Sequence, residues 1–257
     1  TGNAVTQPLS DRSRWIRNFR PAPAARMRLV CFPHAGGSAS YFFPLSTALS
    51  PEFDVHTVQY PGHQDRYSEP FVDNIEDMAD EAFAALEPLG EAPVALFGHS
   101  MGAVLAFEVA RRLERSAGRG SAVVFVSGSR APSRYAPERE ATEDSDLIGV
   151  MRDLGGTDPR VLNDPDMLAT FLPAFGNDYR ALQRYHRGTG VGISAPIVVM
   201  TATDDPKTSV ADASAWLEHT SGGGEVHTFE GGHFYLEKQP QKVIEVIAGK
   251  LRASEYS

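Results

Sequence analysis

Short apolar runs alternate with helical patterns along most of this chain, and this alternation restricts the fold more than any other feature. Runs rich in β-branched and aromatic residues predict strands at 27–32, 55–60, 94–97, 123–127, 197–201 and 226–229. Several are apolar throughout, as is typical of strands covered on both faces. Helical spacing of apolar residues occurs at 43–49, 75–86, 103–115, 211–219 and 242–251. The sequence therefore predicts an α/β fold with a mostly parallel central sheet, helices on both faces and a binding crevice where the strands end.

The segment from about residue 130 to 192 interrupts the alternation, because it contains helical patterns but no strand-like run. A structureless loop of this length is implausible in a compact domain. We expect helices at 146–154 and 166–185 that form a lid inserted over the crevice. Their large apolar side chains either line a tunnel for an apolar substrate or only pack the lid onto the domain, and both interpretations stay open. Residues 15–257 are expected to form one domain, preceded by a mobile tail at 1–14.

Composition limits the classes of partner. The chain has 257 residues, of which 42% are hydrophobic and 22% charged, as in an ordinary globular protein. Its net charge of −9 argues against a nucleic-acid partner. No apolar run approaches the roughly 18 residues that cross a bilayer, so we expect no membrane association. The single cysteine, Cys31, lies in an apolar run and is interpreted as a buried small hydrophobe. We expect a cytoplasmic monomer.

The pentapeptide Gly98-His99-Ser100-Met101-Gly102 follows a predicted strand and opens a predicted helix. A Gly-x-Ser-x-Gly in this context is typical of a nucleophile elbow, a sharp turn that exposes the serine oxygen. A serine hydroxyl is a poor nucleophile by itself, so it needs a base nearby and donors for the oxyanion that forms. The two glycines omit side chains that would collide at such a turn.

An acid and then a histidine are expected after such a serine along the chain. Asp204 and Asp205 follow the strand predicted at 197–201, and His233 follows two glycines after the strand predicted at 226–229. The imidazole would accept the serine proton, and the carboxylate would hold the imidazole in the required tautomer. The proline that follows Asp205 favours that residue over Asp204, although sequence logic leaves both open.

Two backbone amides are candidates for the oxyanion hole. Met101 would begin the helix after the serine, and Ala35 lies on the glycine-containing loop after the strand at 27–32. The sequence has no Walker A motif, no dinucleotide fingerprint and no His-Glu-x-x-His or paired-cysteine spacing. We therefore expect no cofactor and no metal.

Taken together, these motifs resemble type II thioesterases, the free-standing editing thioesterases of polyketide and nonribosomal peptide synthases. The matching segments are 29–37, 60–62, 98–102, 154–156, 178–182, 204–206 and 231–234. The resemblance implies an α/β-hydrolase fold, a triad of Ser100, Asp205 and His233, and an oxyanion hole from the amides of Ala35 and Met101. The chain departs from the family pattern at two places. His63 stands where arginine is usual after Pro-Gly, and Gly176-Asn177 stands where an arginine usually precedes Asp-Tyr.

The resemblance implies hydrolysis of acyl thioesters carried on the phosphopantetheine arm of acyl or peptidyl carrier proteins, in editing or release. Arg180, Arg184 and Arg187 are candidates for docking the carrier, which is commonly acidic. One alternative is a general carboxylesterase or lipase, which would share the triad but prefer oxygen esters. Another, of a different class, is a non-catalytic hydrolase-fold binding protein. Every reactive position is filled, which argues against the last alternative.

Overall fold

The computed structural model describes residues 13–87, 92–117, 120–135, 140–141, 143–186 and 190–254. Its seven strands form one sheet in the order β1-β3-β2-β4-β5-β6-β7. Their bounds are β1 Ile16–Arg17, β2 Arg28–Phe32, β3 Asp54–Val58, β4 Val94–His99, β5 Val124–Ser127, β6 Ile197–Ala202 and β7 Gly224–Phe229. Neighbouring strands are parallel except for β1, which is antiparallel to β3. The predicted mostly parallel sheet is confirmed; β1 was not predicted because two residues are too few to show a pattern.

Helices connect the strands in nearly every case. The α-helices are α2 Phe43–Leu49, α3 Ile75–Leu86, α4 Met101–Ala117, α5 Asp144–Leu154, α6 Pro159–Leu162, α7 Pro165–Arg184, α8 Val210–Ser214, α9 Tyr235–Lys238 and α10 Pro240–Ser254. Short 3-10 helices occur at η1 Ser13–Trp15, η2 Ala39–Phe42, η3 Gln64–Arg66, η5 Pro132–Arg134 and η6 Ala215–His219. The helix predicted at 211–219 is divided between α8 and η6. The fold class predicted from the sequence is confirmed.

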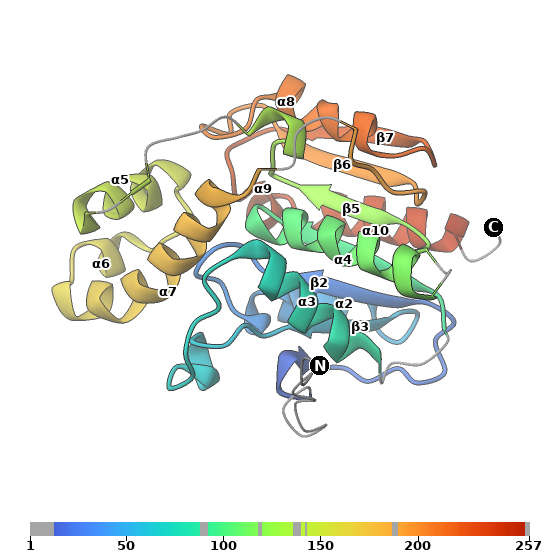
Figure 1. Ribbon diagram of the computed structural model, residues 1–257, viewed down its shortest axis with the longest axis horizontal. Helices are drawn as coiled ribbons and strands as arrows, with labels where there is room; N and C mark the ends of the chain where they lie inside the picture. The colour runs from blue at the N-terminus through green and yellow to red at the C-terminus, as the bar shows by residue number, and fades with distance from the viewer. Residues whose placement is uncertain are drawn as a thin grey trace, which may run out of the picture.

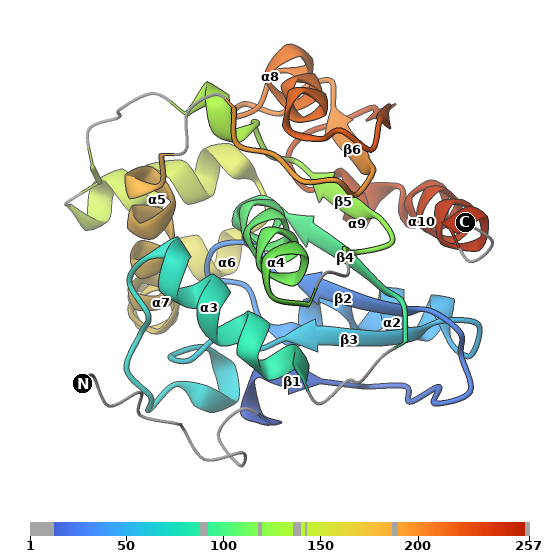
Figure 2. The same cartoon turned by 45° about the vertical axis from the view of Figure 1, so that its right-hand side comes forward.

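The sheet is buried on both faces, as its apolar strands predicted. Adjacent residues of a strand point to opposite faces. Accordingly, Val30 and Leu96 pack in the cluster that includes α3 and α4, whereas Leu29 and Phe97 pack in the cluster that includes α2 and α10. Figure 2 shows α3 and α4 in front of the sheet and α10 beyond its other face.

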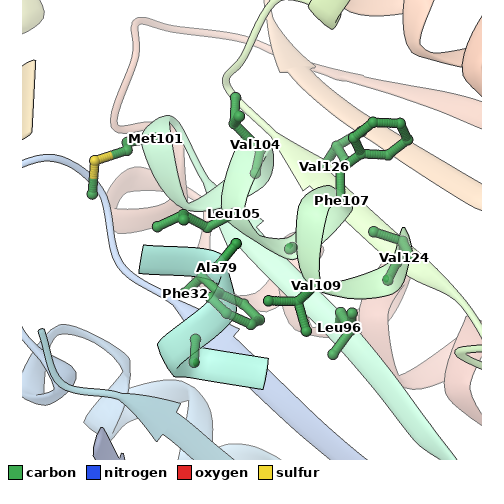
Figure 3. Close-up of a cluster of buried hydrophobic side chains, with 14 of the residues drawn as sticks. Phe32, Ala79, Leu96, Met101, Val104, Leu105, Phe107, Val109, Val124 and Val126 are labelled. Carbon is green, nitrogen blue, oxygen red and sulfur yellow. The ribbon is translucent and has the colours of Figure 1, made fainter. Parts of the chain in front are cut away.

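Helix α4 is the central helix of the first cluster. Its side chains Val104, Leu105 and Phe107 are fully buried, and Figure 3 shows them among Leu96 and Val124 of the sheet. Burial of side chains of this size contributes roughly 1.5–3 kcal/mol each. The start of α4, which directly follows Ser100, is therefore held rigidly against β4.

Helices α5, α6 and α7 form a group of their own, which we call the lid helices. They lie between β5 and β6 in the sequence and gather on the left in Figure 1. Leu147, Met151, Leu172 and Phe175 form a separate buried cluster among them. Helix α6 was not predicted because it has only one turn, which begins at the N-cap Asp158.

Two further predictions concern the tail before β1 and membrane-spanning segments. Of the predicted tail at 1–14, residues 1–12 lie outside the described residues, and Ser13 and Arg14 belong to η1. In the described ranges, no helix combines the length and hydropathy needed to traverse a bilayer.

Candidate active site

Ser100 lies in the sharp turn between β4 and α4. Its backbone φ is +57°, in the left-handed region that non-glycine residues rarely adopt. The flanking glycines make this turn possible. A Cβ atom on Gly98 would lie 1.9 Å from the carbonyl oxygen of Gly102, and a Cβ atom on Gly102 would lie 1.9 Å from that of Phe32. This is the geometry expected of a nucleophile elbow.

A hydrogen bond joins the side chains of His233 and Asp205. Nδ1 of His233 lies 2.7 Å from Oδ2 of Asp205, and both side chains are buried. The second carboxylate oxygen of Asp205 accepts the backbone N–H of Lys207 at 2.9 Å. Asp204, in contrast, is exposed and accepts a hydrogen bond from the hydroxyl of Thr203. Of the two aspartates that the sequence left open, it is therefore Asp205 that contacts the imidazole.

The other nitrogen of His233 is available for chemistry. Nε2 is buried and has no hydrogen-bond partner among the described residues. Because Asp205 accepts the proton on Nδ1, neutral His233 carries its lone pair on Nε2. His233 and Ser100 line the same cavity. The structure thus brings Ser100 and His233 to one cavity without a hydrogen bond between them, and proton transfer between the two side chains stays a prediction.

The two predicted oxyanion donors lie in positions that suit the role. Met101 is the first residue of α4. Its N–H therefore has no hydrogen-bond acceptor within the helix. Ala35 lines the cavity beside Ser100 and sits in a turn that the N–H of Gly37 closes onto the carbonyl of His34, at 2.9 Å.

Two further histidines surround His233, and sequence reasoning gave neither a role. Ring centroids of His99 and His233 are 5.0 Å apart, and those of His34 and His99 are 6.2 Å apart. Burial, together with the nearby His233 and His63, lowers the pKa of His34 to about 3. Burial also lowers the pKa of His99, whose Nδ1 contacts the hydroxyl of Ser127. Both rings are thus neutral near pH 7 and add no charge beside His233. His99 lies inside the elbow pentapeptide, which was the one available signal.

Two neighbouring cavities share part of their lining at the candidate site. One, of about 70 Å³, contains Ser100 and His233 and is also lined by Arg130 and Lys207. The other, of about 290 Å³, extends among the lid helices. Residues that line both cavities are His34, Ala35, Leu154, Phe175 and Phe234. Phe234 follows His233 directly, but nothing in its spacing predicted that it would line both cavities.

Some lid side chains line a cavity and others pack within the lid, whereas a tunnel for an apolar substrate stays a prediction. Leu154, Phe175, Tyr179 and Leu182 line the cavity that contains Ser100, whereas Leu147 packs inside the lid.

Nowhere in the described ranges do three or more His, Cys, Asp or Glu side chains gather as a metal site would require.

The predicted docking arginines are only partly described. Arg184 is half-exposed and paired with Glu140. Arg180 lies on the same helix, and Arg187 lies outside the described residues. Neither Arg180 nor Arg184 lines either cavity, and the docking role of all three arginines stays a prediction.

Comparison with known proteins identifies the family. A family model described as a thioesterase domain matches residues 27–251. The chain is 44% identical to a probable cadicidin biosynthesis thioesterase of Streptomyces griseus, over 96% of this chain and 68% of that protein. It is 42% identical to the thioesterase PikA5 of Streptomyces venezuelae, over 95% and 88% of the two chains. Among solved structures, that of the type II thioesterase BorB from the borrelidin biosynthetic cluster superposes with a TM-score of 0.85 at 44% identity, and covers 93% of this chain and 98% of that one.

Proposed function

Because this chain belongs to the thioesterase family and is a thioester hydrolase, we propose that it hydrolyses acyl thioesters on the phosphopantetheine arm of acyl or peptidyl carrier proteins. It would do so as an editing or releasing enzyme of polyketide or nonribosomal peptide biosynthesis, a setting supported by its similarity to thioesterases of biosynthetic clusters. The observation that carries the proposal is the bond between Asp205 and His233, with Nε2 of His233 unpartnered at the cavity of Ser100.

In the proposed mechanism, Oγ of Ser100 attacks the thioester carbonyl carbon while Nε2 of His233 takes its proton. The N–H groups of Ala35 and Met101 stabilise the negative charge that develops on the carbonyl oxygen. The C–S bond then breaks, and His233 returns the proton to the sulfur, which leaves as the carrier thiol. Water attacks the acyl-enzyme in the same way, with His233 as base, and the free acid departs.

The two cavities suggest how the substrate is divided between them. The cavity with Arg130 and Lys207 is suited to the polar arm, which ends in a phosphodiester. The larger cavity is lined in part by apolar lid side chains, including Met151, Val161 and Phe171, and is suited to the acyl group. The thioester carbonyl would then lie near the residues that line both cavities, beside Ser100.

A direct comparison of two substrates tests the proposed function. We expect kcat/KM for an acyl group carried on a phosphopantetheinylated carrier protein to exceed that for the matched oxygen ester by at least about tenfold, because a carrier thioester has a better leaving group and fills both cavities. Thiol release and acid release are the measurements. Equal rates, or a preference for the oxygen ester, would instead favour a carboxylesterase. Carrier binding without turnover would favour the non-catalytic alternative.

The assignment of the acyl cavity predicts a change in chain-length preference. Val161→Trp adds a bulky ring to the larger cavity only. We expect kcat/KM for an eight-carbon acyl carrier to fall about tenfold, the order of effect of overfilling a packed apolar site, while the value for an acetyl carrier changes little.

Met167→Trp is the matched control, since Met167 lies on the lid, is 45% exposed and lines neither cavity. The same loss on both chain lengths in V161W, or equal effects of the two variants, would show that the acyl group does not occupy this cavity.

A further inference from the structure

Asp178, on lid helix α7, makes contacts that the proposed mechanism does not use. Its side chain is fully buried and accepts three hydrogen bonds from separate donors. Oδ2 accepts the backbone N–H of Gly36 at 2.8 Å and lies 2.7 Å from Nε2 of His63. Oδ1 accepts from the amide of Asn177 at 3.1 Å. Burying a carboxylate costs folding free energy unless hydrogen-bond donors surround it. The three donors therefore hold the Asp178 carboxylate in one position.

The partner of Asp178 is the loop that carries the proposed oxyanion donor. In the four-residue turn from His34 to Gly37, Gly36 has a φ of +73° at the third position, while Ala35 is not among the residues with positive φ. This combination defines a type II turn. Types I and II differ by a flip of the central peptide, which here joins Ala35 to Gly36. The flip would turn the carbonyl of Ala35 toward the carboxylate of Asp178, which repels it.

Helix α7 also touches this loop through its backbone. A Cβ atom on Gly36 would lie 3.1 Å from Cβ and 3.2 Å from Cα of Phe175, one turn before Asp178. From the other side, the hydroxyl of Tyr60 donates to the carbonyl of Pro33 at 2.9 Å. The loop is thus held between the 60–63 segment and the lid.

His63 completes the contact. Burial alone would lower the pKa of His63, but the carboxylate of Asp178 raises it above its ordinary value, against the smaller opposing effect of Arg66. The ring is buried between α7 and the Pro61 carbonyl, which Nδ1 contacts at 2.9 Å. The histidine that departs from the family pattern therefore serves as the partner of the buried Asp178.

We infer that Asp178 is a positioning residue: by accepting the N–H of Gly36 it anchors the 34–37 turn to α7, and so fixes the place of the preceding His34–Ala35 peptide, whose N–H is the proposed oxyanion donor. The oxyanion hole is therefore complete only while α7 is docked. This inference rests on the proposed function, in which Ala35 supplies one of the two donors.

The test removes the acceptor while keeping its volume. Asp178→Leu is expected to lower kcat about 10- to 100-fold with KM changed less than threefold, because loss or displacement of one oxyanion donor acts on the transition state. Inactivation of Ser100 by a fluorophosphonate, whose phosphoryl oxygen also occupies the hole, should slow by a similar factor. Asp178→Asn keeps one acceptor oxygen but replaces the other carboxylate oxygen, which also accepted a hydrogen bond, with an NH2 group. We expect it to lose about fivefold in kcat, which provides a readout if the leucine variant does not fold.

Asp164→Ala is the matched control. Asp164 also stabilises α7, as its N-cap that accepts the N–H groups of Asp166 and Met167 at 2.9 and 3.1 Å, but it lines neither cavity. We expect its kcat to stay within about twofold of wild type, with melting temperatures recorded for all variants. Equal losses in D164A and the Asp178 variants, or a wild-type kcat in folded D178L or D178N, would overturn the inference. Failure of the proposed function differs, since wild-type enzyme would then neither release thiol nor be modified at Ser100.

Discussion

Ser100→Ala is expected to reduce kcat for carrier-bound thioesters by about 10⁴-fold or more, because the variant has no atom that can form the acyl-enzyme. The substitution removes one oxygen at a turn fixed by Gly98, Gly102 and the buried start of α4. Binding of the acyl carrier should persist, so KM or a directly measured Kd is expected to change little. Thiol release in a single-turnover experiment, together with mass spectrometry of the trapped acyl-enzyme, makes the measurement.

Ser129→Ala is the control for this experiment. Ser129 lines the same cavity, but its hydroxyl contacts the carbonyl of Arg130 rather than His233. We expect S129A to retain a rate within a few-fold of wild type. Turnover by S100A at the wild-type rate, or an acyl group found on another residue, would show that Ser100 is not the nucleophile.

Asp205→Asn should be nearly as damaging, with a loss of about 10⁴-fold in kcat. An amide in this position can present its NH2 group to Nδ1 of His233, which would then place the imidazole proton on Nε2, where the serine proton must go. Because Asp205 also accepts the N–H of Lys207, one of its two oxygens stays tied to the backbone. The measurement is kcat as a function of pH, on a variant whose melting temperature is matched to wild type.

Asp204→Asn is the neighbouring control, made on an exposed side chain that contacts only Thr203 in the described structure. We expect it to keep kcat within about twofold of wild type. If D204N lost activity and D205N did not, the acid would have been assigned to the wrong residue.

The sequence predicted the fold and the candidate triad because both depend on local patterns. Uninterrupted apolar runs mark strands covered on both faces, and the bounds predicted for α2 and α3 agree with the structure at both ends. Gly98 and Gly102 could be interpreted because only a very close backbone approach requires glycine at both positions. Proline after Asp205 gave only a preference, whereas the 2.7 Å contact with His233 separates the two aspartates.

Contacts between distant segments could not be predicted from such patterns. Asp178 and Gly36 are 142 positions apart, and nothing in their spacing indicates that they meet. The strand β1 pairs through only two residues, too few to show alternation. The rings of His34, His99 and His233 come from three separate segments of the chain, so their shared environment, and with it the lowered pKa of His34, emerges only from packing.

The lid helices have two structural roles in one stretch of chain. Side chains such as Tyr179 and Leu182 line the cavity that contains Ser100, while their neighbour Asp178 accepts a hydrogen bond from the loop that follows β2. A lid of this kind is not a freely exchangeable module. Substitutions at the cavity-facing positions of α7 can change substrate selectivity without affecting the contact with Gly36. Replacing the whole lid with that of a relative that lacks an acceptor opposite Gly36 would change selectivity and also slow the enzyme.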